Sequence, residues 1–224
     1  MKKVVASIMC ANAMKMQTEL NALAEAGIDW LHCDVMDAVF VDNLAMAPYN
    51  LQPIVADRRF TTDIHLAACH PETIAKLFFA TPPDYLTFHI EACRDPAQLI
   101  EAIHSQGIKA GIAISPATDL DQLLPFVAKV DLVLVMTVPP GFSGQAFRNR
   151  VLPKLRALQD YLKTLEVPPL VQVDGNINLQ TIKQINAYGS ANLFVVGTSG
   201  LFNGEQWSYR EKVEALKKVI GVSG

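Results

Sequence analysis

Two histidines and two aspartates stand where their side chains are able to meet inside a folded chain. His32 and Asp34 are two positions apart in a mostly apolar segment, and an extended strand turns positions i and i+2 to one face. His65 and Asp174 lie near the ends of two other apolar segments. Buried charges are costly unless they are paired or bound to a metal. Because these side chains suit Zn²⁺, Fe²⁺, Mn²⁺ or Co²⁺, we expect one divalent metal ion and leave its identity open.

A second group of residues, rich in glycine, lies late in the chain. Glycine lets backbone N–H groups approach an anion closely, and small hydroxyls add further donors. One such segment alone is a turn signal, but three that follow successive strands indicate an anion site, because barrels often hold phosphate there. We therefore expect a phosphorylated small-molecule substrate. The residues are Gly141, Phe142, Ser143 and Gly144, then Gly175 and Asn176, then Gly197, Thr198 and Ser199.

The elements that must position these residues alternate regularly along the chain. Near-continuous apolar runs are typical of parallel strands that are buried on both faces. Between them, Asp95 and Asn178 begin helical patterns, and Ser208 with Glu211 forms a capping box. Eight such units predict an α/β fold, a (β/α)8 TIM barrel in a single domain over residues 1–224. The predicted strands are 4–9, 30–36, 61–67, 85–91, 109–115, 132–138, 170–174 and 193–197.

The main alternative fold is an open, doubly wound sheet. That fold favours a glycine-rich G-x-G-x-x-G turn after the first strand. Residues 9–13 read Met-Cys-Ala-Asn-Ala and lack it, so the barrel is the preferred prediction.

Composition excludes several classes of partner. The net charge of −3 provides no basic excess to neutralise the phosphates of a nucleic acid. No apolar run reaches the roughly 18–20 residues of a membrane span, and the N-terminus lacks the pattern of a signal peptide. Four cysteines without a C-x-x-C pair indicate reduced thiols. We expect a cytoplasmic protein with neither a nucleic-acid nor a membrane partner.

Five motifs together resemble the ribulose-phosphate 3-epimerase family. The similarity runs from Ser7 to about Phe202, which is nearly the whole chain. The motifs are residues 32–37 with 40–44 for the second strand, 63–66 for the third, 89–92 for the fourth, 140–147 for the phosphate loop and 173–177 for the seventh strand.

The resemblance implies a metal-dependent isomerase that inverts C3 of a ketose phosphate in the pentose phosphate pathway. The expected reaction interconverts D-ribulose 5-phosphate and D-xylulose 5-phosphate. In the family, the residues matching His32, Asp34, His65 and Asp174 bind the metal. Those matching Asp34 and Asp174 also transfer the proton on opposite faces of a metal-stabilised enediolate. Ser7, His65 and Asp174 are expected to contact the substrate, the three glycine-rich loops to hold its phosphate, and the chains to form a homo-oligomer.

The chain departs from the family pattern outside the expected metal and proton-transfer residues. The eighth-strand segment 196–203 is closer to the allulose-6-phosphate 3-epimerase branch, which acts on a ketose one carbon longer. Loss of a methionine at Ala67 or Ala68 is expected to open room for that carbon, so a hexulose phosphate is the alternative substrate. The departures are Ala38, Asp42, Ala67, Ala68, Pro139, Asn176 and the segment 45–48.

The residues at the predicted strand ends count against two other functions. A barrel decarboxylase or synthase would carry a lysine near a strand end, and no predicted strand has one there. A non-catalytic binding module would not need both aspartates and all four metal ligands. His89 is expected to be a hydrogen-bonded core histidine, with Asp63 and Glu91 supporting the site or closing the barrel end.

Overall fold

The computed structural model describes residues 2–221 and folds them into a closed barrel of eight parallel strands. Each strand pairs with the next, and the last pairs back with the first, with Val4 beside Phe194. The predicted TIM barrel is therefore confirmed, while residue 1 and residues 222–224 of the predicted domain lie outside the described part. The strands are β1 Lys3–Ser7, β2 Trp30–Met36, β3 Thr61–Ala67, β4 Tyr85–His89, β5 Lys109–Ile114, β6 Leu132–Met136, β7 Leu170–Asp174 and β8 Leu193–Val196.

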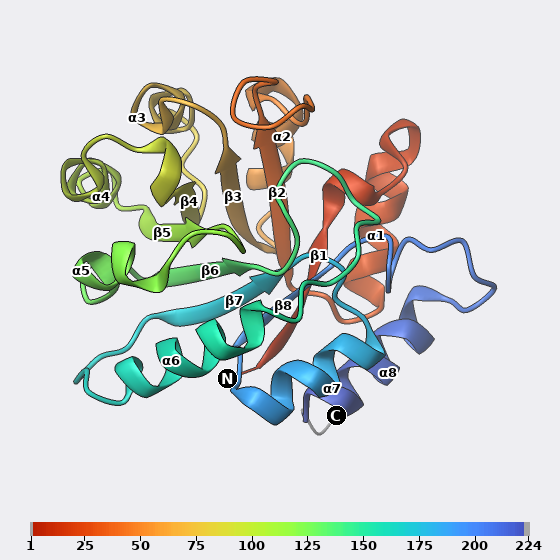
Figure 1. Cartoon of the computed structure of the whole chain (residues 1–224). Helices are drawn as coiled ribbons and strands as arrows, with labels where there is room; N and C mark the ends of the chain where they lie inside the picture. Colours follow the sequence, from red (N-terminus) through yellow and green to blue (C-terminus); the bar gives the residue numbers. More distant parts are fainter. Residues whose placement is uncertain (1, 222–224) are drawn as a thin grey trace.

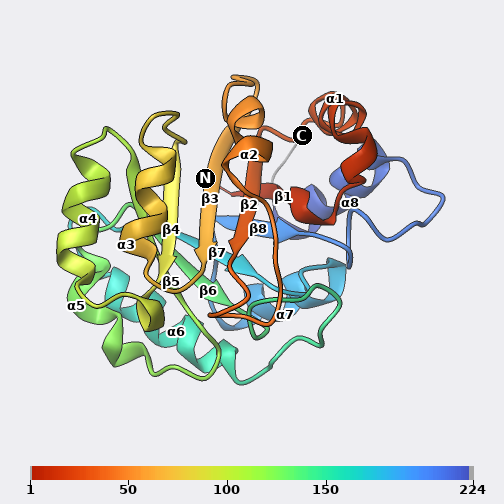
Figure 2. The same ribbon diagram turned by 90° about the horizontal axis from the view of Figure 1, so that it is seen from above.

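Helices surround the barrel on its outer side (Figures 1 and 2). They are α1 Met16–Glu25, α2 Pro48–Val55, α3 Pro71–Ile74, α4 Pro96–His104, α5 Leu124–Val127, α6 Val151–Leu162, α7 Leu179–Tyr188 and α8 Tyr209–Ile220. The predicted helix starts are confirmed: Asp95 caps α4 through the N–H of Gln98, Asn178 caps α7, and Ser208 with Glu211 forms the capping box of α8. None of the helices within residues 2–221 is long and apolar enough to cross a membrane.

Five predicted strands were one or two residues too long at their carboxyl ends. β1 ends at Ser7 and β4 at His89, because short 3₁₀ turns at Ile8–Cys10 and Ile90–Ala92 follow directly. β5, β6 and β8 end one or two residues before the predicted limits of 115, 138 and 197. The backbone leaves the strand ladder at these ends, but the residues that follow are still mostly apolar or small. The sequence pattern therefore continues past the end of the strand. Glu91 therefore lies in a turn beyond β4 rather than within the strand.

Two apolar regions hold the barrel together. The larger lies between the outer faces of the strands and the helices, and includes Leu31, Ile64 and Phe88. The smaller cluster fills part of the barrel interior and includes Leu134 and Val195. Successive side chains of a strand point alternately to its two faces, so every second side chain points into the barrel interior. Near the carboxyl ends of the strands, these interior side chains are polar.

The pairing register brings the polar residues side by side. In β2 and β3, His32 lies opposite Asp63 and Asp34 lies opposite His65. Adjacent strands are roughly 4.8 Å apart, so residues in register on one face are in contact. The parallel ladder alone therefore places two imidazoles and two carboxylates in one small region of the interior.

Two departures from the family pattern adopt backbone conformations that usually favour glycine. Ala38, after β2, has φ 58°, and Asn176, after β7, has φ 52°. Non-glycine residues in this left-handed region are under local strain, although asparagine tolerates it better than alanine. Both residues lie in loops at the carboxyl ends of strands, which is where barrels place their functional sites.

Candidate active site and metal centre

The structure brings His32, Asp34, His65 and Asp174 together at the carboxyl end of the barrel. One donor atom from each side chain lies within 4.8 Å of every other. Asp34 Oδ1 is 3.0 Å from His65 Nδ1 and 3.3 Å from His32 Nε2. His32 Nε2 is 3.2 Å from His65 Nδ1 and 3.9 Å from Asp174 Oδ2. These four side chains form a group that could hold a metal ion.

The spacing of the donors fits a small divalent cation. Metal bonds of about 2.0–2.1 Å to four tetrahedral donors place those donors about 3.3 Å apart. Four of the donor separations are 3.0–3.9 Å, around that value, and none exceeds 4.8 Å. Three of the side chains are almost fully buried, and the Asp174 side chain is 18% exposed. The site is therefore closed toward the barrel interior and open on the side of Asp174.

His32 is oriented by a carboxylate beneath it. Its Nδ1 lies 2.9 Å from Asp63 Oδ2, and Asp63 also accepts a hydrogen bond of 2.6 Å from the Thr87 hydroxyl. An ionised carboxylate only accepts hydrogen bonds, so it favours the proton on Nδ1 and directs the bare Nε2 toward the metal donors. The prediction that Asp63 supports the site agrees with this contact.

His65 is flanked by a second buried histidine. Its Nε2 lies 3.0 Å from Nε2 of His89, and Nδ1 of His89 lies 2.9 Å from Glu91 Oε2. His89 is therefore a hydrogen-bonded core histidine, as predicted. Burial lowers its pKa. Burial opposes ionisation of Glu91, but the hydrogen bond from His89 outweighs it and brings the pKa of Glu91 to about 2.

Asp34 and Asp174 have opposite pKa shifts in the metal-free protein. Burial raises the pKa of Asp34, but contacts with His32 and His65 outweigh it and bring the pKa below its ordinary value. Burial raises the pKa of Asp174 to about 7; His32 opposes this rise, and the charge of Asp34 adds to it. Near neutral pH one carboxyl is ionised while the other is close to half protonated. Carboxyl groups with separated pKa values suit an acid and base that act together.

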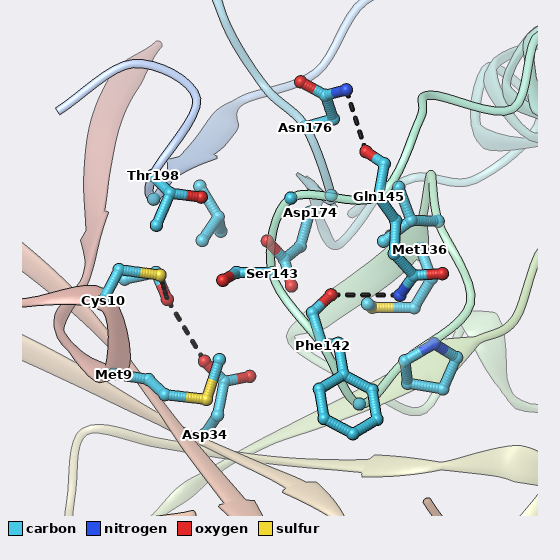
Figure 3. A pocket seen from close by; sticks show the side chains of 18 of the residues that line it. Met9, Cys10, Asp34, Met136, Phe142, Ser143, Gln145, Asp174, Asn176 and Thr198 are labelled. Atoms are coloured by element: carbon cyan, nitrogen blue, oxygen red, sulfur yellow. Dashed lines mark hydrogen bonds between the residues drawn. The ribbon is translucent and has the colours of Figure 1, made fainter. Parts of the chain in front are cut away.

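A hollow of about 560 Å³, measured out to its open mouth, lies above these groups. Asp34 and Asp174 enter it from β2 and β7, as Figure 3 shows. Every residue predicted to contact the substrate lines this hollow: Ser7, His65, Gly141, Phe142, Ser143, Gly144, Asp174, Gly175, Asn176, Gly197, Thr198 and Ser199. Ser7 donates a hydrogen bond of 3.2 Å to Asp34 Oδ2. The three glycine-rich segments therefore line the same hollow as Asp34, His65 and Asp174.

The loop between β6 and α6 is tied to its neighbours by amide side chains. Asn176 donates to the carbonyl of Gln145, and Gln145 donates in turn to the carbonyls of Pro139 and Phe142 (Figure 3). Asn43 donates to the carbonyl of Gly141 from the β2–α2 segment. These bonds hold the loop beside the hollow, and Figures 1 and 2 show it next to the segment that joins β2 to α2. Asn176, which replaces a usual glycine, contributes one of them.

Gly175 shows why a glycine is needed at this wall. Its φ is 118°, and an added Cβ would lie 2.6 Å from Cγ2 of Val138. No larger residue fits there without moving the loop after β6. The close approach packs this segment directly against the residues after β6, and both segments line the hollow.

Sequence reasoning missed the apolar part of the wall. Met9, Met36 and Met136 line the hollow, and the i, i+2 spacing of Met36 from Asp34 was a signal for one of them. Ala67 and Ala68 are fully buried and are not among the lining residues. Ala67 packs in a cluster with Met36, so the side chain of Met36 covers it. Neither alanine borders the hollow, and the expectation that they make room for a longer sugar stays a prediction.

Comparisons with known proteins identify related chains. The model of the Ribulose-phosphate 3 epimerase family matches residues 3–202. A ribulose-phosphate 3-epimerase of Synechocystis sp. is 35% identical over 216 residues, which cover 96% of this chain and 92% of the relative. A relative from Oryza sativa named ribulose-phosphate 3-epimerase, cytoplasmic isoform, is 32% identical and covers 97% of this chain and 94% of its own length.

A solved structure confirms the architecture at low sequence similarity. The 3-keto-L-gulonate-6-phosphate decarboxylase of Vibrio cholerae has a TM-score of 0.70 at 12% identity, covering 98% of this chain and 97% of its own. This likeness concerns the fold alone. The family match over most of the chain, with relatives above 30% identity, establishes the rest: this chain belongs to the ribulose-phosphate 3-epimerase family and is an isomerase that acts on carbohydrates.

Proposed function

We propose that the protein interconverts D-ribulose 5-phosphate and D-xylulose 5-phosphate with one divalent metal ion at His32, Asp34, His65 and Asp174. The observation that carries this proposal is the meeting of these donors beneath a hollow that also contains three glycine-rich loops. The loops supply a place for the phosphate, and the donors lie where the reacting carbons would be held.

The two aspartates carry the proton. The hydrogen on C3 is next to the C2 carbonyl, and its removal leaves a planar enediolate that can be protonated from either side. Asp34 and Asp174 extend from strands that are not neighbours in the barrel. One carboxylate removes the proton, and the other, protonated carboxyl returns a proton to the opposite face of C3.

The remaining residues bind and orient the sugar. The hydroxyl of Ser7, 3.2 Å from Asp34, is placed to contact the substrate near the proton-transfer centre. Met9, Met36 and Met136 exclude water from one side of the hollow. When bound, the divalent ion would supply positive charge that stabilises developing negative charge on the substrate oxygens. Nitrogen and oxygen donors of this kind suit Zn²⁺, Fe²⁺, Mn²⁺ or Co²⁺.

The pentulose phosphate is the preferred substrate because the relatives are named ribulose-phosphate 3-epimerases. The segment 196–203 favours the longer sugar, but Ala67 and Ala68, where loss of a methionine would make room for it, do not line the hollow. Pro139 and Asn176 do line it, and Asn176 ties the loop after β6 inward. We therefore treat D-allulose 6-phosphate as the competing substrate in the test.

The wider setting is proposed from the relatives. The Oryza sativa relative is named a cytoplasmic isoform, and we place this protein in the cytoplasm as well. We propose assembly into a homo-oligomer, and a small-molecule sugar phosphate as the substrate without nucleic-acid or membrane partners. The net charge of −3 is consistent with the absence of a polyanionic partner.

The experiment measures kcat/KM on D-ribulose 5-phosphate and D-allulose 6-phosphate with metal-free and metal-reloaded protein. We expect turnover of the pentulose phosphate only after a divalent ion is added back, and a higher kcat/KM for it than for the hexulose phosphate. A preference for D-allulose 6-phosphate would replace the substrate while retaining the chemistry. Full activity in thoroughly metal-free protein would overturn the assignment of the metal.

A further inference from the structure

The nitrogen of His65 that faces away from the proposed metal site contacts a buried histidine of β4. His65 Nδ1 lies beside Asp34 and His32, whereas its Nε2 lies 3.0 Å from Nε2 of His89. The two ring centroids are 5.0 Å apart. His89 is fully buried, and its other nitrogen, Nδ1, lies 2.9 Å from Glu91 Oε2. The three side chains form one line from the end of β4 to the metal donors.

Hydrogen-bond roles along this line follow from the groups at its two ends. A neutral imidazole has one N–H donor and one bare acceptor nitrogen, and a carboxylate has acceptors only. A metal takes the bare nitrogen, so a ligating Nδ1 on His65 requires the proton on Nε2. That proton is donated to Nε2 of His89, which must then carry its own proton on Nδ1. His89 donates it to Glu91, and every contact in the line is satisfied.

Glu91 is itself held in place by the loop after β5. Its second oxygen, Oε1, accepts a hydrogen bond of 2.7 Å from the N–H of Ser115. Lys154 donates to the carbonyls of Ser115 and Pro116 and holds this loop against α6. Both carboxylate oxygens of Glu91 are therefore used, one on the backbone and one on His89.

We propose that Glu91, acting through His89, is a positioning residue that keeps the proton of His65 on Nε2 and leaves Nδ1 free for the metal. The proposal rests on the metal site of the proposed function. Asp63 holds the proton of His32 on Nδ1 by direct contact. A carboxylate therefore fixes the tautomer of each histidine, directly for His32 and through His89 for His65. Loss of such supporting contacts typically weakens metal binding about 10- to 100-fold.

Glu91→Gln is the informative substitution because glutamine offers only one acceptor where two donors converge. If its oxygen faces the Ser115 N–H, its NH₂ group faces His89 Nδ1 and favours the other tautomer of His89. The proton of His89 then lies on Nε2, and His65 must accept there, which places its own proton on Nδ1. We expect the affinity for Co²⁺, measured by visible absorption against a competing chelator, to fall about 10- to 100-fold.

A matched control variant exists at the opposite end of the barrel. Asp131 Oδ2 accepts from His104 Nε2 and from the N–H of Ala110, which are the same kinds of partner that Glu91 has. Asp131→Asn is expected to leave the affinity for Co²⁺ unchanged. A general loss of stability from removing a carboxylate would affect both variants. Loss of the hydrogen-bond relay, the line from Glu91 through His89 to His65, would affect Glu91→Gln alone.

The tautomers provide a second readout that does not need the variant to fold. In wild-type protein with ¹⁵N-labelled histidine and bound Zn²⁺, two-bond N–H NMR correlations should place the proton of His89 on Nδ1 and that of His65 on Nε2. A proton on Nε2 of His89, or unchanged Co²⁺ affinity in Glu91→Gln, would overturn the relay alone. Wild-type protein that binds neither ion would instead refute the metal site of the proposed function, and the relay with it.

Discussion

Asp34 and Asp174 share one site but contribute differently to the energy of the metal-free fold. Asp34 is ionised and contacts His32 and His65, so its charge is compensated. Asp174 is also drawn into the site, and its nearest cationic partner, His32, is 3.9 Å away. A carboxyl group that is buried with weak compensation prefers to be neutral. The same weakness leaves Asp174 free to gain and lose a proton near neutral pH.

The raised pKa of Asp174 predicts a pH-dependent effect of Asp174→Asn in metal-free protein. A group whose pKa is higher in the folded state stabilises the fold at low pH, and that contribution is lost as pH rises to about 7. Asp174→Asn has no carboxyl to ionise at this position. Its free energy of unfolding should therefore increase relative to that of the wild type as pH rises, by up to about 1.4 kcal/mol per pH unit between roughly 4 and 7. Urea denaturation at pH 5 and pH 8 measures it.

Asp34→Asn is a comparison of opposite sign. The pKa of Asp34 is lowered, so its carboxyl stays ionised across pH 5 to 8, and its charge raises the pKa of His32. Its replacement removes the partner of two histidines and should destabilise the metal-free protein at both pH values. A pH-independent effect of Asp174→Asn, or stabilisation by Asp34→Asn, would contradict the assigned electrostatics.

At the level of the elements, neighbouring strands cooperate to orient a single imidazole. Thr87 of β4 donates to Asp63 of β3, which receives His32 of β2. The space for Thr87 comes from Gly111 of β5, which lies opposite it in the ladder. A Cβ at Gly111 would lie 2.1 Å from the Thr87 hydroxyl oxygen. Four successive strands thus contribute to the position of one candidate metal ligand.

Gly111→Ala should disrupt this arrangement. Because the new methyl group displaces Thr87, the bond to Asp63 is lost and His32 is less well oriented. We expect the free energy of unfolding to fall by about 1–3 kcal/mol and the affinity for Co²⁺ to fall about 10-fold or more. Chemical denaturation and cobalt titration measure the two effects.

Gly189→Ala is the control for that substitution. An added Cβ at Gly189 meets no atom nearer than 3.5 Å, and its φ of −166° is extended backbone that alanine adopts readily. Its metal affinity should equal that of wild type. If Gly111→Ala also bound Co²⁺ as wild type does, the strand-to-strand support of His32 would have no role in metal binding.

The sequence predicted the parts of the site that depend on strand periodicity. His32 and Asp34 share a face because they are two residues apart, and their neighbours on β3 follow from the register. The helix starts were predictable because Asn178 and Ser208 act through local hydrogen bonds. The strand ends were not, because the 3₁₀ turns that close β1 and β4 give no periodic signal. The burial of Ala67 was also inaccessible, since it depends on the side-chain packing of Met36.

At the scale of the whole molecule, the fold and the chemistry are separable. The Vibrio cholerae decarboxylase shares the barrel at 12% identity, so the closed sheet alone does not select a reaction. In the proposed function the reaction depends on the polar side chains at the carboxyl ends of β2, β3 and β7, with the glycine-rich loops around them. The family match over residues 3–202 spans all of these strands and loops.

The central claim is that Asp34 and Asp174 exchange the C3 proton of a ketose phosphate on opposite faces. The most direct test incubates D-ribulose 5-phosphate with metal-loaded protein in D₂O and follows C3 by NMR. The account predicts D-xylulose 5-phosphate with one deuterium at C3 from the wild type, and no epimer from Asp34→Asn or Asp174→Asn, with both variants folded. Epimer that retains its original C3 hydrogen, or normal turnover by either variant, would contradict the two-aspartate mechanism.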